Sequence, residues 1–185
     1  MLGTSRRRIA QRSCGFSTVC GFLLSLSGAL CDTSAIEKGG AAEVTLTADG
    51  ETPLNLLHNQ DLSDVTLTPP ASGVVEIAFN YQDPLVDVAI TLDSKRFSQG
   101  DSASFPAAGA FTDDELSMTV SYADEVYTSQ SDSASGTIDF ELLHVDDNGA
   151  DVRVAFDVQL ATSSAKTLSV SGFIEDIVGS PGVDP

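Results

Sequence analysis

Two acidic loops contain the side chains best suited to bind a ligand. Their residues are Asp146, Asp147, Asn148 and Asp151 in one loop, and Asp113, Asp114 and Glu115 in the other. Ca²⁺ takes about six to eight oxygen ligands, which carboxylates, amide oxygens and backbone carbonyls of a bent loop supply. Neither loop matches the EF-hand pattern, because Gly149 stands where a spacer is required and no Glu closes the loop at the twelfth position. Both loops are therefore candidate calcium sites, with a solvated acidic turn as the alternative.

Nucleophilic catalysis and zinc binding have few candidate side chains. All three cysteines precede residue 32, and the rest of the chain has only His58 and His144. A Ser–His–acid triad would have to use one of these two imidazoles, and a zinc site needs three or four converging ligands. We interpret both as hydrogen-bonded structural residues. The alternation of its strand places His144 on the inward face, together with Ile138, Phe140 and Leu142.

Carboxylate chemistry is the remaining catalytic option. A glycosidase needs two carboxylates, and a chain with so many acids contains such pairs by chance. Sugar-stacking aromatics are scarce, since there is no Trp and there are three Tyr. A small exported hydrolase, carboxylate-based or metal-assisted, is therefore an alternative function. Its available residues are Asp113, Asp114, Glu115, Asp146 and Asp151.

The first 35 residues differ in composition from the rest. Arginines between Arg6 and Arg12 are followed by an apolar run over Val19–Leu30 and by small residues up to Ala35. This order is typical of a secretion signal. The apolar run is shorter than the roughly 20 residues that a membrane-spanning helix needs. We predict an export signal over residues 1–35, cleaved after Ala35, and no transmembrane helix in the mature chain.

The segment Ser5-Arg6-Arg7-Arg8-Ile9 resembles the twin-arginine export signal, in which two adjacent arginines follow Ser or Thr and precede an apolar residue. The resemblance covers this segment alone. It implies export after folding, in some substrates around a cofactor. General secretion is the alternative, in which the arginines are the positive region of an ordinary signal.

Cys31 offers a different form of attachment. A Cys at the cleavage point can carry lipid that holds the mature domain to a membrane surface. Here Leu30 precedes it, where lipoprotein signals place a small residue. The two alternatives are a lipid-anchored envelope protein that begins at Cys31 and a cysteine-free protein that begins at Ile36.

The predicted mature chain is strongly acidic. Removal of residues 1–35 takes away four Arg and one Asp, and changes the net charge from −18 to −21. This charge argues against nucleic acid as a partner, because phosphate binding needs clustered Lys and Arg. A secreted core without cysteine is typical of a prokaryotic rather than a small eukaryotic exported domain. We expect the protein in the periplasm, at the cell surface or outside a prokaryotic cell.

Alternation of apolar and polar residues predicts antiparallel strands. In Asp151–Leu160 every second residue is apolar, and Val86–Asp93 repeats the pattern. The other predicted strands are Glu43–Ala48, Ser63–Thr68, Gly73–Tyr81, Leu116–Ala123, Gly136–His144 and Thr167–Glu175. Pro53–Leu62 offers at most a helical turn or two, and residues 123–136 are predicted as a loop or an edge strand.

Turn residues between these runs define the expected fold. Asn148-Gly149 predicts a hairpin between Gly136–His144 and Asp151–Leu160, because both residues tolerate positive φ. Short strands with frequent turn signals predict an antiparallel β-sandwich of about eight strands, with a closed antiparallel β-barrel as the alternative. We expect a single domain over residues 36–178 and a frayed tail over residues 179–185.

The sequence favours an exported, non-catalytic surface, envelope or binding module on this scaffold. Function would then lie in the loops or on one sheet face. The hydrolase and the lipid-anchored protein are the alternatives. Calcium is the only cofactor that the sequence offers, and a protein or envelope partner is possible, although the sequence does not identify one.

Overall fold

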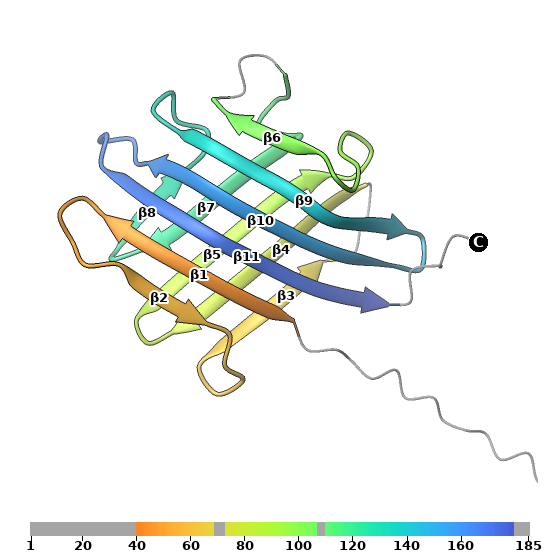
Figure 1. Ribbon diagram of the computed structural model, residues 1–185, viewed down its shortest axis with the longest axis horizontal. Coiled ribbons are helices and arrows are strands. Elements are labelled where there is room, and N and C mark those ends of the chain that lie inside the picture. Colours follow the sequence, from red (N-terminus) through yellow and green to blue (C-terminus); the bar gives the residue numbers. More distant parts are fainter. Residues whose placement is uncertain (1–39, 69–72, 107–109, 180–185) are drawn as a thin grey trace, which may run out of the picture. The chain divides into compact units, whose positions relative to one another are not determined.

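The computed structural model describes residues 40–68, 73–106 and 110–179 (Figure 1). The chain divides into two units, Met1–Ser34 and Ala35–Pro185, and all described residues belong to the second. The predicted export signal, Cys31 and all of the tail except Gly179 lie outside these ranges. Within them, no helix is long and apolar enough to cross a bilayer.

The described residues form β-strands joined by turns and loops. The strands are β1 (Ala41–Ala48), β2 (Leu54–Leu57), β3 (Ser63–Thr68), β4 (Val74–Gln82), β5 (Leu85–Asp93), β6 (Ser102–Phe105), β7 (Leu116–Tyr122), β8 (Glu125–Thr128), β9 (Ser135–Asp146), β10 (Gly149–Ala161) and β11 (Thr167–Gly179). Every pairing among them is antiparallel. The prediction of an antiparallel all-β fold is confirmed.

The strands follow one continuous hydrogen-bonded path, in the order β2-β1-β11-β10-β8-β7-β5-β4-β3, and β9 adds to β10 and carries β6 on its other side. Figure 1 shows β6, β9, β10, β11, β1 and β2 in one layer, with the remaining strands crossing behind it. A single residue pair, Ala161 with Thr128, links β10 to β8 where the path passes between layers.

The core lies between these layers and follows from the alternation of each strand. Inward residues of β4 and β5, among them Phe79 and Ile90, are fully buried. Inward residues of β10 and β11, such as Val154 and Ile174, meet them from the other layer. Because side chains of a strand alternate between faces, the polar residues between these positions face outward.

A β-bulge in β9 corrects the predicted orientation of its last residues. Leu142 pairs with Arg153 and Phe140 pairs with Val154, so Glu141 is an extra residue. Such an insertion reverses the facing of all residues beyond it. Leu143, and not Leu142, packs against the core, and His144 opposes the outward residue Asp151. The predicted inward position of Leu142 and His144 is therefore wrong.

Three strands are additional to the eight that the sequence predicted. Strand β2 lies within Pro53–Leu62, where the sequence predicted at most helical turns, and pairs with β1. Strand β8 lies within residues 123–136 and buries Tyr127 to 5% exposure. Strand β6 was not predicted at all. The apolar residues of Pro53–Leu62 are compatible with the period of a helix and with that of a strand, because the segment is too short to distinguish the two.

The predicted hairpin between β9 and β10 is confirmed, although its backbone differs from the expected one. Neither Asn148 nor Gly149 has a positive φ. The turn between β7 and β8 has this geometry instead, with φ of 51° at Ala123 and 62° at Asp124. Two successive residues with positive φ are typical of a type I′ hairpin turn.

Candidate binding hollow beside strand β6

A hollow of about 440 Å³ lies beside β6, where the connections from β5 and to β7 meet. Its polar lining includes Arg96, Asp101, Ser102 and Ser104, and its aromatic lining is Phe97 and Phe111. Small-molecule sites are commonly about 300–1,000 Å³ in volume and combine apolar walls with a few placed polar groups. We call this feature the β6 hollow.

Two phenylalanines, Phe97 and Phe111, line the β6 hollow, and the rings of Phe105 and Phe140 pack against them. The ring of Phe97 lies 5.8 Å from that of Phe111 and 4.9 Å from that of Phe140, measured between centroids. Phe105 meets Phe111 edge to face at 5.5 Å. All four are buried, with Phe97 the most exposed at 9%. Contacting aromatic rings of this kind form a rigid apolar surface.

A tight turn after β5 places the adjacent side chains of Arg96 and Phe97 in different environments. The Asp93 carboxylate accepts a hydrogen bond from the Lys95 N–H at 2.9 Å, and the Asp93 carbonyl accepts one from the Arg96 N–H at 2.9 Å. This turn directs the Phe97 ring into the core, whereas the Arg96 side chain stays 51% exposed. The turn thus brings an aromatic wall and a cation to the same rim.

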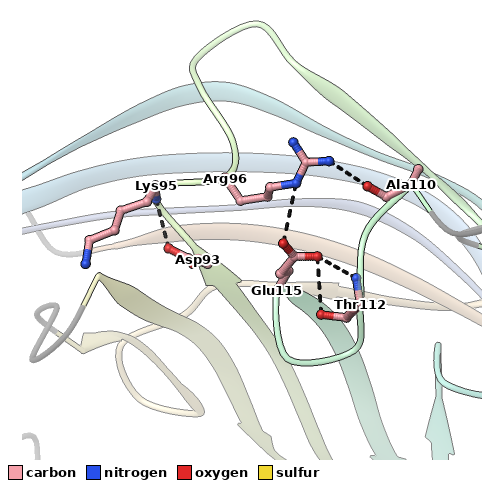
Figure 2. A network of polar contacts seen from close by, with 6 residues as sticks. All are labelled: Asp93, Lys95, Arg96, Ala110, Thr112 and Glu115. Atoms are coloured by element: carbon pink, nitrogen blue, oxygen red, sulfur yellow. Dashed lines mark hydrogen bonds and ion pairs between the residues drawn. The ribbon is translucent and has the colours of Figure 1, made fainter.

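The Arg96 guanidinium connects the two segments that flank β6 (Figure 2). Its Nη2 donates to the Ala110 carbonyl at 2.6 Å, and its Nε lies 3.5 Å from Oε1 of Glu115. The other oxygen of Glu115 accepts hydrogen bonds from the Thr112 N–H at 2.6 Å and the Thr112 hydroxyl at 3.2 Å. A guanidinium has five N–H donors, so donors remain for an anionic group in the hollow.

Asp101, the residue directly before β6, contributes a negative side chain to the lining of the hollow. Its Oδ2 accepts a hydrogen bond from the Ser98 N–H at 2.8 Å, which closes the turn before β6. The lining therefore carries one positive and one negative side chain, Arg96 and Asp101. A ligand with a single negative charge suits this arrangement better than one with several.

The predicted calcium loop over residues 146–151 serves as the turn between β9 and β10. Oδ1 of Asp146 accepts hydrogen bonds from the backbone N–H of Asn148 at 2.7 Å and of Gly149 at 3.0 Å. Its Oδ2 lies 3.8 Å from Nε2 of His144. Asp151 lies opposite His144 in the ladder. Asp146 is thus already engaged by the backbone of its own turn.

The predicted calcium loop over residues 113–115 is divided between two roles. Asp113 and Asp114 are exposed in the turn before β7, whereas Glu115 holds Arg96 and Thr112. Among the described residues, no group of three or more Cys, His, Asp or Glu side chains is placed to hold a metal ion. Both loops stay candidate calcium sites, with a solvated acidic turn as the alternative.

A second polar cluster surrounds His58, between β2 and β3. His58 Nδ1 lies 3.0 Å from the Ser63 hydroxyl oxygen, which also accepts the Asn59 N–H at 2.7 Å. The same hydroxyl lies 3.0 Å from the Asn59 carbonyl, and Ser63 is only 7% exposed. This Ser–His contact, which the sequence did not predict, closes a local turn. His58 is hydrogen-bonded, as expected, whereas Nε2 of His144 is buried without a hydrogen-bond partner among the described residues, contrary to the prediction.

No cluster of like residues marks the β6 hollow in the sequence, so it was not predicted. Two signals were present. Lys95-Arg96 is the only adjacent basic pair after residue 35, and Phe97, Phe105 and Phe111 are three of the nine phenylalanines. No family model, curated protein or solved structure matches this chain, so its functional assignment depends on the fold and on this site.

Proposed function

We propose that this protein is an exported, non-catalytic binding module, and that it takes a small ligand with an apolar body and one anionic group into the β6 hollow. The observation that carries the proposal is the position of Arg96 beside Phe97 and Phe111 in one hollow of about 440 Å³. The rings offer apolar contact area, and the guanidinium offers charge-assisted hydrogen bonds.

The charge of the whole domain affects how such a ligand would bind. The predicted mature chain carries five basic and 26 acidic residues, all of the latter after Ala35. Its field repels anions at long range, whereas Arg96 attracts them at contact. Salt screens the long-range term more strongly than a contact pair. We therefore expect affinity for a monoanion to change little, or to increase, from low to moderate salt.

Anilinonaphthalene sulfonate, an aromatic monoanion, tests the proposal by fluorescence titration. Arg96→Gln should weaken its affinity about tenfold, which corresponds to about 1.4 kcal/mol, and Phe111→Leu should weaken it through altered ring contact. Lys166→Gln is the matched control, because Lys166 is an exposed cation paired with Glu125 outside the hollow. Equal affinity in wild type and Arg96→Gln would contradict the proposal.

The finer architecture is part of the same proposal. We infer a two-layer β-sandwich rather than a closed barrel. In the described chain, β2 and β3 end the hydrogen-bonded path, and only Ala161 and Thr128 join β10 to β8. Hydrogen exchange tests this inference, since half of the backbone amides of β2 and β3 should exchange rapidly at open edges. Protection of every amide in both strands would favour a barrel.

Export and attachment are tested on the protein recovered from its native host. The mass of the intact exported species distinguishes an unmodified chain that begins near Ile36 from a lipidated chain that begins at Cys31. We expect the unmodified species in a periplasmic or extracellular fraction. A full-length species in the cytoplasm would contradict export, and a heavier species in the membrane fraction would establish the lipid anchor.

A further inference from the structure

We propose that the ligand of the β6 hollow is the C-terminal end of an extended peptide, which adds a strand to the open edge of β6 and places its carboxylate on Arg96. This inference rests on the proposed function of the hollow. It specifies the ligand as a peptide whose last residue is apolar and whose only negative charge is its terminal carboxylate.

The open edge of β6 follows from its pairing. Strand β6 pairs with β9, and within the described residues no strand lies on its other side. Phe140 exchanges hydrogen bonds with the residues just before β6: its N–H donates to the Asp101 carbonyl at 2.9 Å, and its carbonyl accepts from Gly100 at 2.7 Å. The Asp101 carbonyl therefore faces β9 at the point where the ladder between β9 and β6 begins, although the Asp101 N–H donates to the Ser98 carbonyl.

Hydrogen-bonded and non-hydrogen-bonded pairs alternate along an antiparallel ladder. Ala103 and Phe105, two and four residues beyond Asp101, thus direct their backbone groups toward β9. Ser102 and Ser104 direct their N–H and C=O groups the opposite way. Both serines line the β6 hollow, so this hollow provides the space that a neighbouring strand, about 4.8 Å away, would occupy.

Strand addition to an exposed sheet edge is an established mode of peptide recognition, in which main-chain hydrogen bonds provide affinity and side-chain pockets provide specificity. In this protein the main-chain groups come from Ser102 and Ser104. The buried rings of Phe97 and Phe111 form the adjacent apolar surface. One apolar side chain of the peptide would pack there while its backbone pairs with β6.

The short length of the edge favours a chain end over a continuous segment. Pro106 follows β6 directly and has no N–H to extend the ladder. On the flanking segments, the contact between Arg96 and the Ala110 carbonyl joins one connection to the other (Figure 2). A peptide that ends at Arg96 leaves this contact intact. A terminal carboxylate also matches the planar donor pair of a guanidinium.

Charge restricts the rest of the peptide. Asp101 lies in the lining, and the domain around it is strongly acidic. Further acidic residues in the peptide would be repelled by these groups, whereas uncharged or basic residues would be tolerated or attracted. The terminal carboxylate is therefore the one negative group that the hollow accommodates.

Two pools of acetylated hexapeptides test the inference on the exported protein. Both pools have Leu, Val or Phe at the last position and mixed Ser, Thr and Lys before it, and they differ only in a free or amidated C-terminus. The free-acid pool should shift the backbone amide signals of Ser102 and Ser104 in nitrogen-labelled protein. Its affinity should exceed that of the amide pool about tenfold, and Arg96→Gln should abolish the difference.

Ser104→Pro tests the edge itself. It removes an N–H that points into the hollow and keeps the pairing with β9, because proline is tolerated on the open side of an edge strand. It should weaken peptide binding about tenfold. Ser104→Ala keeps the N–H and should weaken peptide binding far less than Ser104→Pro. If Ser104→Pro does not fold, the inference is tested by the difference in affinity between the free-acid and amidated pools, measured for the wild type and for Arg96→Gln.

The outcomes separate this inference from the proposed function. If binding of anilinonaphthalene sulfonate depends on Arg96 but neither peptide pool shifts the amide signals of Ser102 and Ser104, the peptide inference is overturned and the proposed function stands. Equal binding of both pools overturns the assignment of the terminal carboxylate to Arg96. Dye binding that does not depend on Arg96, with no peptide shift at Ser102 or Ser104, overturns both.

Discussion

Arg153 on β10 and Glu175 on β11 are direct partners in the ladder, and Nη1 of the arginine lies 2.7 Å from Oε2 of the glutamate. Nε of the same guanidinium donates to Glu141, the bulged residue of β9, at 2.5 Å. The ring of Phe173 lies 4.1 Å from the guanidinium carbon. Hydrogen bonds to Glu141, and next to Glu175, raise the pKa of Arg153 above its ordinary value. One cation thus connects three strands on the outward face.

Replacing Arg153 should cost more than replacing a singly paired cation. Arg153→Gln leaves Glu141 and Glu175 facing each other, so we expect the free energy of unfolding to fall by about 1 kcal/mol, the upper end for exposed pairs. Urea unfolding measures it. Lys166→Gln, which removes one exposed pair with Glu125, should change stability less. Added salt should reduce the difference through screening; equal losses in the two variants would contradict the expectation.

Asp176 lies in an environment that opposes its negative charge. It lies on β11 between Ile174 and Val178, which both pack against the core. Burial is the main cause that raises its pKa above the ordinary 3.8, and Asp64 adds to it. The Ile177 N–H, which donates to its carboxylate at 2.8 Å, and His58 act in the opposite direction.

The raised pKa of Asp176 predicts a specific pH dependence. Because the folded state binds this proton more tightly than the unfolded state, the carboxylate destabilises the fold at neutral pH, and the penalty disappears as the pH falls through the folded pKa toward 3.8. Asp176→Asn should therefore stabilise the protein at neutral pH by about 1 kcal/mol, the low end for a partly buried polar group.

Urea unfolding across the acidic pH range tests this dependence. Asp157→Asn, which removes an exposed acid from β10, is the control with the same change of charge. The advantage of Asp176→Asn over this control should shrink toward low pH. An advantage that is constant with pH, or equal in the two variants, would show that burial of Asp176 is not its cause.

Strand positions were predictable because they depend on a local period. All eight alternating ranges form strands, and Asp151–Leu160 lies wholly within β10. Alternation reports directly which face is buried, so no tertiary information is needed. Strands β2 and β6 were not predicted, because four residues are too few to establish a period. The bulge at Glu141 was not predicted, because one inserted residue leaves no signal in the composition, yet it reverses the facing of His144.

The β6 hollow was not predictable for a different reason. Phe97, Phe111 and Phe140 lie far apart in sequence and at no common spacing, and their rings come together only in the folded chain. The open edge of β6 is likewise a property of the completed sheet. The acidic loops were conspicuous in sequence, but the structure divides their oxygens among turns and the Arg96 contact.

Gly172 should be the glycine of β11 that is least tolerant of a side chain. Its φ is +141°, and an added Cβ would lie 1.9 Å from the carbonyl oxygen of Glu43 on β1. Backbone strain and overpacking each cost about 1–3 kcal/mol, so Gly172→Ala should lower the free energy of unfolding by about 3 kcal/mol. Gly50→Ala, at φ +78° with no atom within 4 Å of its Cβ, should cost about 1 kcal/mol. Similar losses in urea unfolding would contradict the register of β1 with β11.

The turn of Asp146 leads to a final prediction, on calcium. Its Oδ1 already accepts two backbone N–H groups, and Ca²⁺ would have to compete with them for the same oxygen. We expect the same melting temperature in Ca²⁺ and in Mg²⁺ at constant ionic strength. Asp146→Ala should lower stability by about 1–2 kcal/mol through the lost hydrogen bonds, whereas Asp147→Ala, in the same turn, should cost less. A rise in melting temperature specific to Ca²⁺, and lost in Asp146→Ala, would instead identify this turn as a calcium site.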